Sequence, residues 1–209
     1  ITEQNQWGVF QQFDLHPVIM IVCSFIILDC LIYWQHRLFH KIPLLWRIHC
    51  VHHSDKDLDA TSGVRFHPIE IILSIIVKST AVIILGIPVI AVLIFEVLLN
   101  MFPIFNHSNI QISERLDHYL RWLVVTPDMH RIHHSVYKPE TNSNYGFSIS
   151  IWDRLFNSYT DKPRDGQQNM IIGLDNIPAS ESVSLVSLLL QPFKQRPIKY
   201  QQKYTGDSS

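Results

Sequence analysis

The chain has 209 residues, enough for one domain rather than two, and its charged fraction of 17% is low for a soluble protein. Seventeen basic and eighteen acidic side chains give a net charge of −1, so no nucleic-acid partner is expected. The three cysteines form no CxxC pair, which excludes a disulfide scaffold. The unusual residue is histidine, with twelve copies.

The first predicted element is a transmembrane helix over residues 17–34, an apolar run with a single charge, Asp29. The chain starts at Ile1 rather than Met, and we expect a trimmed chain with further membrane segments upstream. A second apolar region, residues 69–105, is interrupted by Gly86-Ile87-Pro88. It predicts a transmembrane helical hairpin that turns there. A buried hairpin in a soluble fold is the alternative.

Two charges lie in the arms of this hairpin, Lys78 before the turn and Glu96 after it, at equal distances from Ile87. The hairpin therefore places both at a similar depth, where an unpaired charge is costly. We predict that they pair across the hairpin. In the alternative, Lys78 extends alone toward water.

Lysine and arginine are absent from residues 1–16 and frequent between the first span and the hairpin and after it. The positive-inside bias then places the histidine clusters on the cytoplasmic side. We predict an all-α integral membrane protein with one span, one hairpin and a cytosolic metal-binding cap over residues 107–160. Residues 161–209 form a tail whose last dozen residues are polar. Within it, residues 182–193 predict a helix, either interfacial or packed on the core.

Eight histidines occur in three clusters, of which the first is an HxxxH pair and the other two are HxxHH. Residues spaced i, i+3 and i+4 share one helical face, so each cluster can present several imidazoles together. Eight imidazoles exceed the needs of one metal ion, and they predict two. The eight are His36 and His40, then His49, His52 and His53, then His130, His133 and His134.

The remaining histidines are weighed singly. His107 follows the hairpin at the level of the clusters and is a predicted ligand, while His67, before the hairpin, is either a ligand or a packing residue. His118 fits an exposed helix face, and His16 lies before the first span on the opposite side. Asp29 shares a helical stripe with the first cluster, and we expect it to orient the ring N–H groups.

These residues resemble the fatty acid hydroxylase/sterol desaturase superfamily of membrane di-iron enzymes, including its bacterial-type sterol desaturase members. The resemblance covers most of the chain, from about Asp29 to Thr160. The matching strings begin with Asp29-x6-HRLFH and HxxHHS and continue with FHPIE (66–70), FNHSN (105–109), HxxHH, NYG (144–146) and WDRLF (152–156).

The resemblance implies two irons, O2-dependent hydroxylation or desaturation of a sterol, fatty acyl or alkylglycerol lipid, and an external electron donor. That donor would be cytochrome b5, a ferredoxin or a reductase. It implies that the eight clustered histidines and His107 are ligands, with His67 less certain, and that Glu70 and Asn109 join Asp29 in orienting them. Zinc can substitute in a purified sample. The residues alone leave open a di-zinc membrane hydrolase, although such enzymes usually include carboxylate ligands. A non-catalytic metal-binding membrane protein also stays open.

Overall fold

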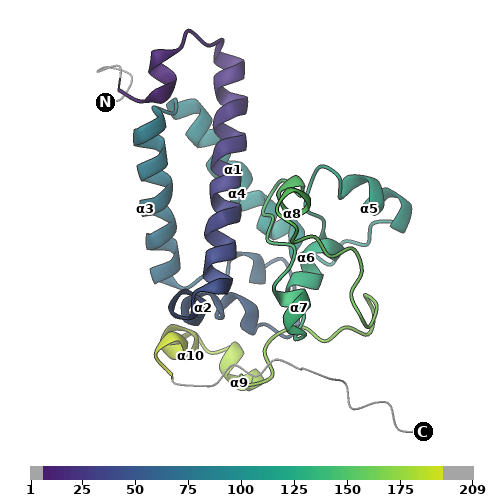
Figure 1. Ribbon diagram of the computed structural model, residues 1–209. Coiled ribbons are helices and arrows are strands. Elements are labelled where there is room, and N and C mark those ends of the chain that lie inside the picture. The colour runs from purple at the N-terminus through teal and green to yellow at the C-terminus, as the bar shows by residue number, and fades with distance from the viewer. Residues whose placement is uncertain (1–6, 195–209) are drawn as a thin grey trace, which may run out of the picture.

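The computed structural model describes residues 7–194, and this part of the chain is helical, with two isolated β-bridges and no sheet. The all-α prediction is confirmed for these residues. Three helices are long and apolar enough to cross a membrane, namely α1 (Pro17–Lys41), α3 (Pro68–Leu85) and α4 (Val89–Asn106). They stand side by side, and most of the shorter helices lie beside the lower half of α1 or beneath it (Figure 1).

Helix α1 starts and ends at positions that proline sets. Pro17 occupies its first turn, where a missing N–H costs nothing, and the His16 ring caps the helix by accepting from the Val18 N–H. The helix ends at Lys41, because the residue before Pro43 is pushed into an extended conformation. Helix α1 therefore continues past the predicted boundary at residue 34 and carries the first histidine cluster. Helix α2 (Pro43–His49) follows directly.

Helices α3 and α4 match the two predicted hairpin arms to within one residue. The turn between them depends on Gly86, whose φ of 70° is left-handed and strains any residue with a Cβ. A Cβ at this position would also lie 2.7 Å from the Trp7 carbonyl oxygen. The short helix η1 (Val9–Gln12) packs here, and the Gln11 side chain donates to the Gly86 carbonyl. The amino-terminal segment thus closes the upper end of the bundle.

The core of the upper bundle is aromatic and aliphatic. Phe25 on α1 packs edge-on against Phe95 on α4, with ring centroids 5.9 Å apart. Lys78 on α3 and Glu96 on α4 form an ion pair with an N–O distance of 2.5 Å. The predicted pairing across the hairpin is therefore confirmed. The buried core residues are Phe10, Leu28, Ile32, Ile87, Ala91 and Phe95.

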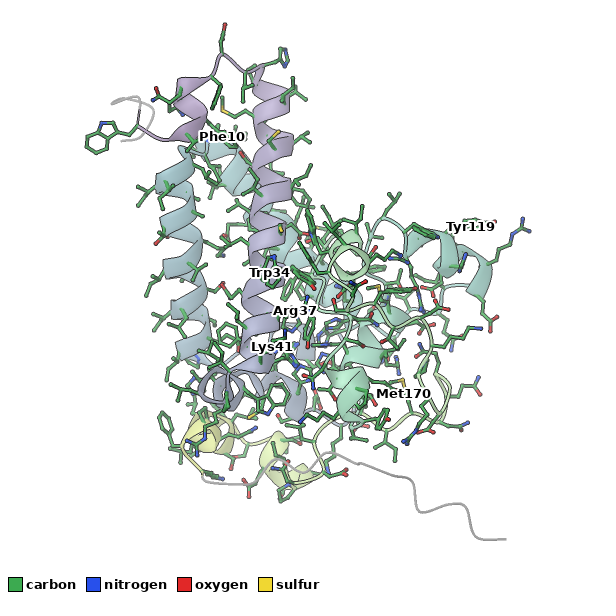
Figure 2. The ribbon with its side chains drawn as sticks, viewed as in Figure 1. Phe10, Trp34, Arg37, Lys41, Tyr119 and Met170 are labelled. Atoms are coloured by element: carbon green, nitrogen blue, oxygen red, sulfur yellow. The ribbon has the colours of Figure 1, made fainter. Side chains whose placement is uncertain are left out.

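The cap lies beside the lower half of α1 (Figure 1). Arg37 joins the two parts, since its guanidinium donates to the Tyr33 hydroxyl and to the Phe156 carbonyl of the cap (Figure 2). Short 3-10 helices η2 (His52–Ser54) and η3 (Ser62–Val64) connect α2 to α3. The helices of the cap are α5 (Glu114–Leu120), α6 (Pro127–His133), α7 (Lys138–Thr141) and α8 (Ile151–Leu155).

Beneath α2 lie α9 (Ala179–Ser182), α10 (Leu185–Leu190) and η4 (Gln191–Phe193). These three helices lie where the sequence predicted a helix at residues 182–193. The Gln191 side chain donates a hydrogen bond to the Cys50 carbonyl and so holds them against the end of α2. Helix α10 has no buried residue, so packing among residues 7–194 does not account for its leucines. An interfacial position for it stays a prediction. The last dozen residues of the predicted polar tail lie outside the described residues.

Candidate metal centre

Nine histidines from five separate segments meet where α1, α2, α4 and α6 converge. All nine are buried, and within each of two groups the candidate ligand atoms lie within 4.8 Å of one another. The segments are the end of α1, the end of α2, η2, the end of α4 and α6. The first histidine group is His36, His40, His49, His53 and His133, and the second histidine group is His52, His107, His130 and His134.

Each HxxHH cluster contributes to both groups. In the cluster that starts at His49, the middle histidine, His52, points to the second group and its two neighbours to the first. In the cluster that starts at His130, the middle histidine, His133, points to the first group and the other two to the second. The two clusters thus enter the site with opposite assignments. Histidines that share one face of a short cluster therefore belong to two different groups rather than to a single metal site.

The chemistry of these histidines fits metal ligation. Metal binding needs neutral imidazole, and burial, followed by repulsion from neighbouring imidazoles, lowers the pKa of His52, His53 and His134 well below its ordinary value. Burial lowers the pKa of His107 to about 3. Both ring nitrogens of His53 are buried and lack a hydrogen-bond partner among the described residues. A buried polar atom without a partner costs stability, and a metal ion would remove that cost.

Several rings are held by their Nδ1 atoms, which leaves Nε2 directed into the groups. His36 Nδ1 donates to the Tyr145 carbonyl at 2.8 Å, and His133 Nδ1 donates to the Ser143 carbonyl at 2.7 Å. The Nε2 atoms of His36 and His133 then face each other 3.0 Å apart, a spacing suited to two ligands of one ion. A partner on one ring nitrogen fixes the tautomer that binds metal through the other.

The Glu70 carboxylate contacts a clustered histidine. Its Oε1 accepts a hydrogen bond from His49 Nδ1 at 2.8 Å, and both side chains are buried. Glu70 lies in the first turn of α3, so the hairpin itself supplies a negative charge beside the first histidine group. That charge offsets part of the positive charge that metal ions would bring.

Three other residues singled out in the sequence have different partners. Asp29 Oδ2 accepts from the Trp152 indole N–H at 2.8 Å and from the Ile149 N–H at 3.2 Å, so it holds α8 on α1. The exposed Asn109 side chain accepts from the Arg131 guanidinium at 3.2 Å. His67 lies in neither histidine group. It caps α3 through the Ile69 N–H, and its Nε2 contacts the Leu189 carbonyl oxygen.

Other residues support the site without a sequence signal that points to their role. Asp153 accepts from the backbone N–H groups of Tyr145 and Gly146 at 2.7 and 2.8 Å, and so fixes the carbonyl that receives His36. Burial raises the pKa of Asp153 to about 6. The backbone carbonyls of Ser143 and Tyr145 leave no trace in a residue pattern, because every residue has one. Asp153 is visible in the WDRLF string, although its partners are not.

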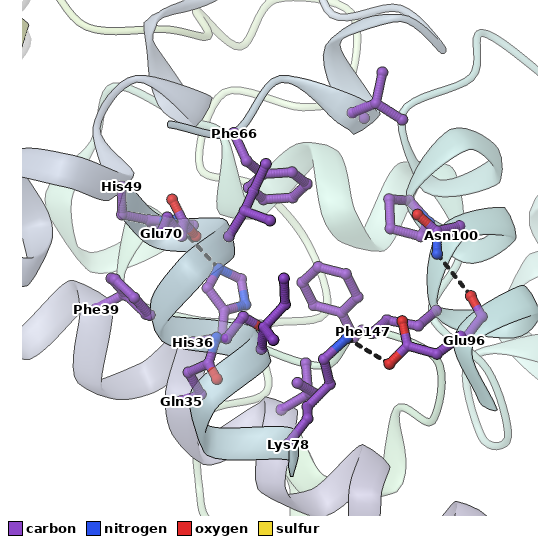
Figure 3. A pocket seen from close by; sticks show the side chains of 18 residues that line it. Gln35, His36, Phe39, His49, Phe66, Glu70, Lys78, Glu96, Asn100 and Phe147 are labelled. Atoms are coloured by element: carbon purple, nitrogen blue, oxygen red, sulfur yellow. Dashed lines mark hydrogen bonds and ion pairs between the residues drawn. The ribbon is translucent and has the colours of Figure 1, made fainter. Parts of the chain in front are cut away.

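A cavity of about 290 Å³ adjoins the first histidine group (Figure 3). His36, His49 and Glu70 mark one end, and the Lys78–Glu96 ion pair marks the other. These ends lie eight residues apart along α3, or about 12 Å at the helical rise. Most of the wall is apolar and comes from α1, α3 and α4, with Phe147 of the cap. The apolar lining includes Ile32, Phe39, Phe66, Ile71, Ile75, Leu99 and Phe147.

The fold and site define a class, that of helical proteins with membrane-length helices and two adjoining, all-imidazole groups beside an apolar cavity. The family model for fatty acid hydroxylases matches residues 21–158, and the chain belongs to this family.

Curated relatives agree with that assignment. Over 84% of this chain and 51% of the relative, the chain is 28% identical to the ornithine lipid hydroxylase OlsE of Rhizobium tropici. It is 31% identical to the alkylglycerol monooxygenase of Xenopus tropicalis over 65% of this chain and 29% of the relative. It is 27% identical to the lathosterol oxidase of Mus musculus over 73% of this chain and 48% of the relative. The chain thus spans about half or less of these relatives, and no solved structure matches it.

Proposed function

We propose that this protein is a membrane-bound di-iron oxidoreductase that uses O2 to hydroxylate or desaturate a lipid, with its histidine groups facing the cytoplasm. The observation that carries the proposal is the pair of adjoining imidazole groups, the first of which lines a cavity between membrane-length helices. The first group would hold one iron and the second group the other. Two bound irons would supply the redox chemistry needed to activate O2 toward an unactivated C–H bond, which redox-silent zinc cannot do.

The protein's own residues bind and orient the substrate. Apolar side chains of α1, α3 and α4 exclude water from the cavity, and His36 and His49 bring the first group to its wall. A volume of about 290 Å³ lies at the lower end of the range for small-molecule sites, so part of a lipid enters while the rest stays in the membrane. Sterol, acyl and alkylglycerol lipids all fit this description.

Hydroxylation inserts one oxygen atom of O2 into a C–H bond and reduces the other to water, and desaturation reduces both atoms to water. Either reaction needs two electrons from outside, and we propose cytochrome b5, a ferredoxin or a reductase as their source. A di-zinc hydrolase has less support, because both groups contain imidazole alone and Glu70 contacts a histidine ring instead of joining a group.

Metal analysis of the detergent-purified protein tests the proposal, with one ligand variant in each group. We expect about two irons per chain, loss of iron in His133→Ala and His52→Ala, and no loss in His118→Ala, whose histidine is exposed on α5. Iron-loaded protein should then consume O2 only when lipid and reductant are both present. Two zinc ions after growth in excess iron would favour the hydrolase, and a metal-free protein would refute the site.

A further inference from the structure

One edge of the cap presents apolar side chains outward, and the proposed function does not use it. This cap edge consists of α5, the turn after it and α8. Its six large apolar side chains are between 49% and 72% exposed. They form a patch of the kind that marks an interaction site rather than a water-facing surface. They are Leu116, Tyr119, Trp122, Leu123, Ile151 and Leu155.

Helix α5 buries an ion pair and exposes large apolar side chains. Asp117 and Arg121 form an ion pair on its inner side, with side chains only 8% and 7% exposed. Leu116 and Tyr119 occupy its outer side, and Figure 2 shows Tyr119 at the upper rim of the cap. Water favours the opposite arrangement, because exposing leucine while burying an ion pair costs free energy twice. An apolar medium outside the cap removes the first cost.

Contacts with α1 set the height of the cap edge along the membrane-length helices. The Trp152 indole of α8 donates to Asp29, which is the middle residue of the 25-residue α1. Phe156 packs on Trp34 with ring centroids 4.8 Å apart. In Figure 1, α8 accordingly lies near the middle of α1, and α5 extends beside the lower half of α1 rather than below its lower end.

This height falls inside a bilayer that α1 crosses. A hydrocarbon layer of about 30 Å takes about 20 helical residues, so a layer that begins at Pro17 ends near His36. Asp29 is then about 10 Å inside the layer, and α8 is held beside it. Ile151 and Leu155 on the outer side of α8 therefore face the medium that surrounds the spans.

We propose that the cap edge is embedded in the lipid leaflet on the histidine side, with α8 and Leu123 in the acyl region and α5 where the acyl region meets the headgroups. The exposed charged residues of α5, Glu114 and Arg115, suit the headgroup level, as Tyr119 and Trp122 do. Arg154 lies against the Trp122 ring, 4.5 Å from its centroid, which shields its charge near lipid.

This embedding would also hold the metal-bearing part of the cap. Backbone pairing joins the cap edge to the segment that leads into α6, because the Val125 N–H donates to the Ser148 carbonyl and Val124 pairs with Ile149. Helix α6 carries His130 and His133. The leaflet would thus position both histidine groups relative to the lipid from which a substrate enters.

Spin labels in phosphatidylcholine nanodiscs test the proposal independently of metal content and activity. The three native cysteines are replaced by alanine, and single labels are placed at Leu123→Cys and Leu155→Cys. Ile76→Cys on the exposed face of α3 is the lipid control, and Gln168→Cys, exposed in the segment that follows the cap, is the water control. Collision rates are measured with O2, which concentrates in lipid, and with chromium oxalate, which stays in water.

We expect both cap-edge labels to follow the Ile76→Cys label, with O2 collisions several-fold more frequent than at Gln168→Cys and few chromium collisions. Frequent chromium collisions at Leu123→Cys and Leu155→Cys would place the edge in water and overturn the proposal. Low collision rates with both reagents would also overturn it, because they would show that protein covers the edge, either a second copy or another part of a longer chain. Retained size-exclusion profiles confirm that the labelled variants are folded.

Discussion

The rings of His53 and His134 stack with centroids 4.3 Å apart and an interplanar angle of 19°. His53 belongs to the first histidine group and His134 to the second. The two groups are therefore contiguous, and two metal ions held by them would share one buried site. The ring centroid of His53 also lies 4.7 Å from that of His133, so the second and third clusters of the sequence are in contact here.

Glu70→Gln should weaken metal binding without removing a ligand. The variant keeps the size of the side chain but replaces the carboxylate that accepts from His49 with a neutral amide. Loss of such an orienting partner typically lowers metal affinity about 10- to 100-fold. Titration with a competing chelator measures the change. Glu96→Gln is the matched control, since this carboxylate lines the same cavity and pairs with Lys78. Equal affinities in the two variants would contradict the assigned role.

Lys78 and Glu96 should show strong coupling in a double-mutant cycle. Lys78→Met or Glu96→Gln alone leaves one charge without its partner inside the hairpin, whereas the double variant leaves neither. We expect the double variant to be more stable than the sum of the single effects implies, by about 1–3 kcal/mol. Unfolding in mixed detergent micelles with increasing denaturing detergent measures the four stabilities. Additive effects would show that the pair contributes no mutual stabilisation.

The metal-free protein should lose stability as the pH falls from 7 to 5. The pKa of His107 is about 3 in the folded protein and returns to its ordinary value of 6.5 on unfolding. Between these values the unfolded chain binds a proton that the folded chain does not, so acid favours unfolding. His107 alone contributes a loss of about 2 kcal/mol at pH 5.

Thermal unfolding of the chelator-treated protein at several pH values measures this effect. Metal-loaded protein should be more stable at every pH, and its advantage should shrink in acid as protons compete for the ligands. His107→Gln, which does not titrate, is the control and should show a shallower dependence. A metal-free protein whose stability is flat from pH 7 to 5 would contradict neutral burial of these imidazoles.

Gln35→Met should leave the fold intact and change which lipids bind. Gln35 lines the cavity beside His36, and its Oε1 atom is buried and has no hydrogen-bond partner among residues 7–194. Removing an unpaired buried acceptor should preserve or raise the melting temperature. A lipid whose hydroxyl or amide donates to this oxygen should bind about 5- to 10-fold more weakly, as expected for one hydrogen bond.

Binding of two lipids of equal chain length, one with a hydroxyl and one without, gives the readout for Gln35→Met. The lipid without a hydroxyl should bind the variant and the unchanged protein alike. A lower melting temperature together with weaker binding of both lipids would assign Gln35 a structural role instead.

The local structure of the long helices follows from sequence. Pro17 and Pro68 occupy first turns, Gly86 permits the left-handed turn, and apolar runs between them have the length of a membrane span. The Lys78–Glu96 pair was also predictable, because a helical rise of 1.5 Å per residue puts charges equally far from a tight turn at the same height. Such features depend on near neighbours in the chain, which a sequence displays directly.

The sequence did not indicate which residues contact the predicted site residues. Asp29 shares a helical stripe with His36, which suggested contact with a ring, yet its carboxylate accepts from Trp152, 123 residues away. Helical periodicity states which residues share a face but not what packs against that face. His67 likewise lies at the chain position expected of a ligand, but its ring caps α3 by accepting from the Ile69 N–H.

The sequence by itself determined that imidazoles cluster in HxxxH and HxxHH patterns, because ligand identity and i, i+3, i+4 spacing are local properties. Only the tertiary structure decided how they divide. His133 joins the first histidine group because His36, 97 residues earlier, meets it there, and His52 joins the second because α4 brings His107 beside it. Packing of segments distant in the chain sets where each ring points, and neither spacing nor composition encodes that arrangement in a readable form.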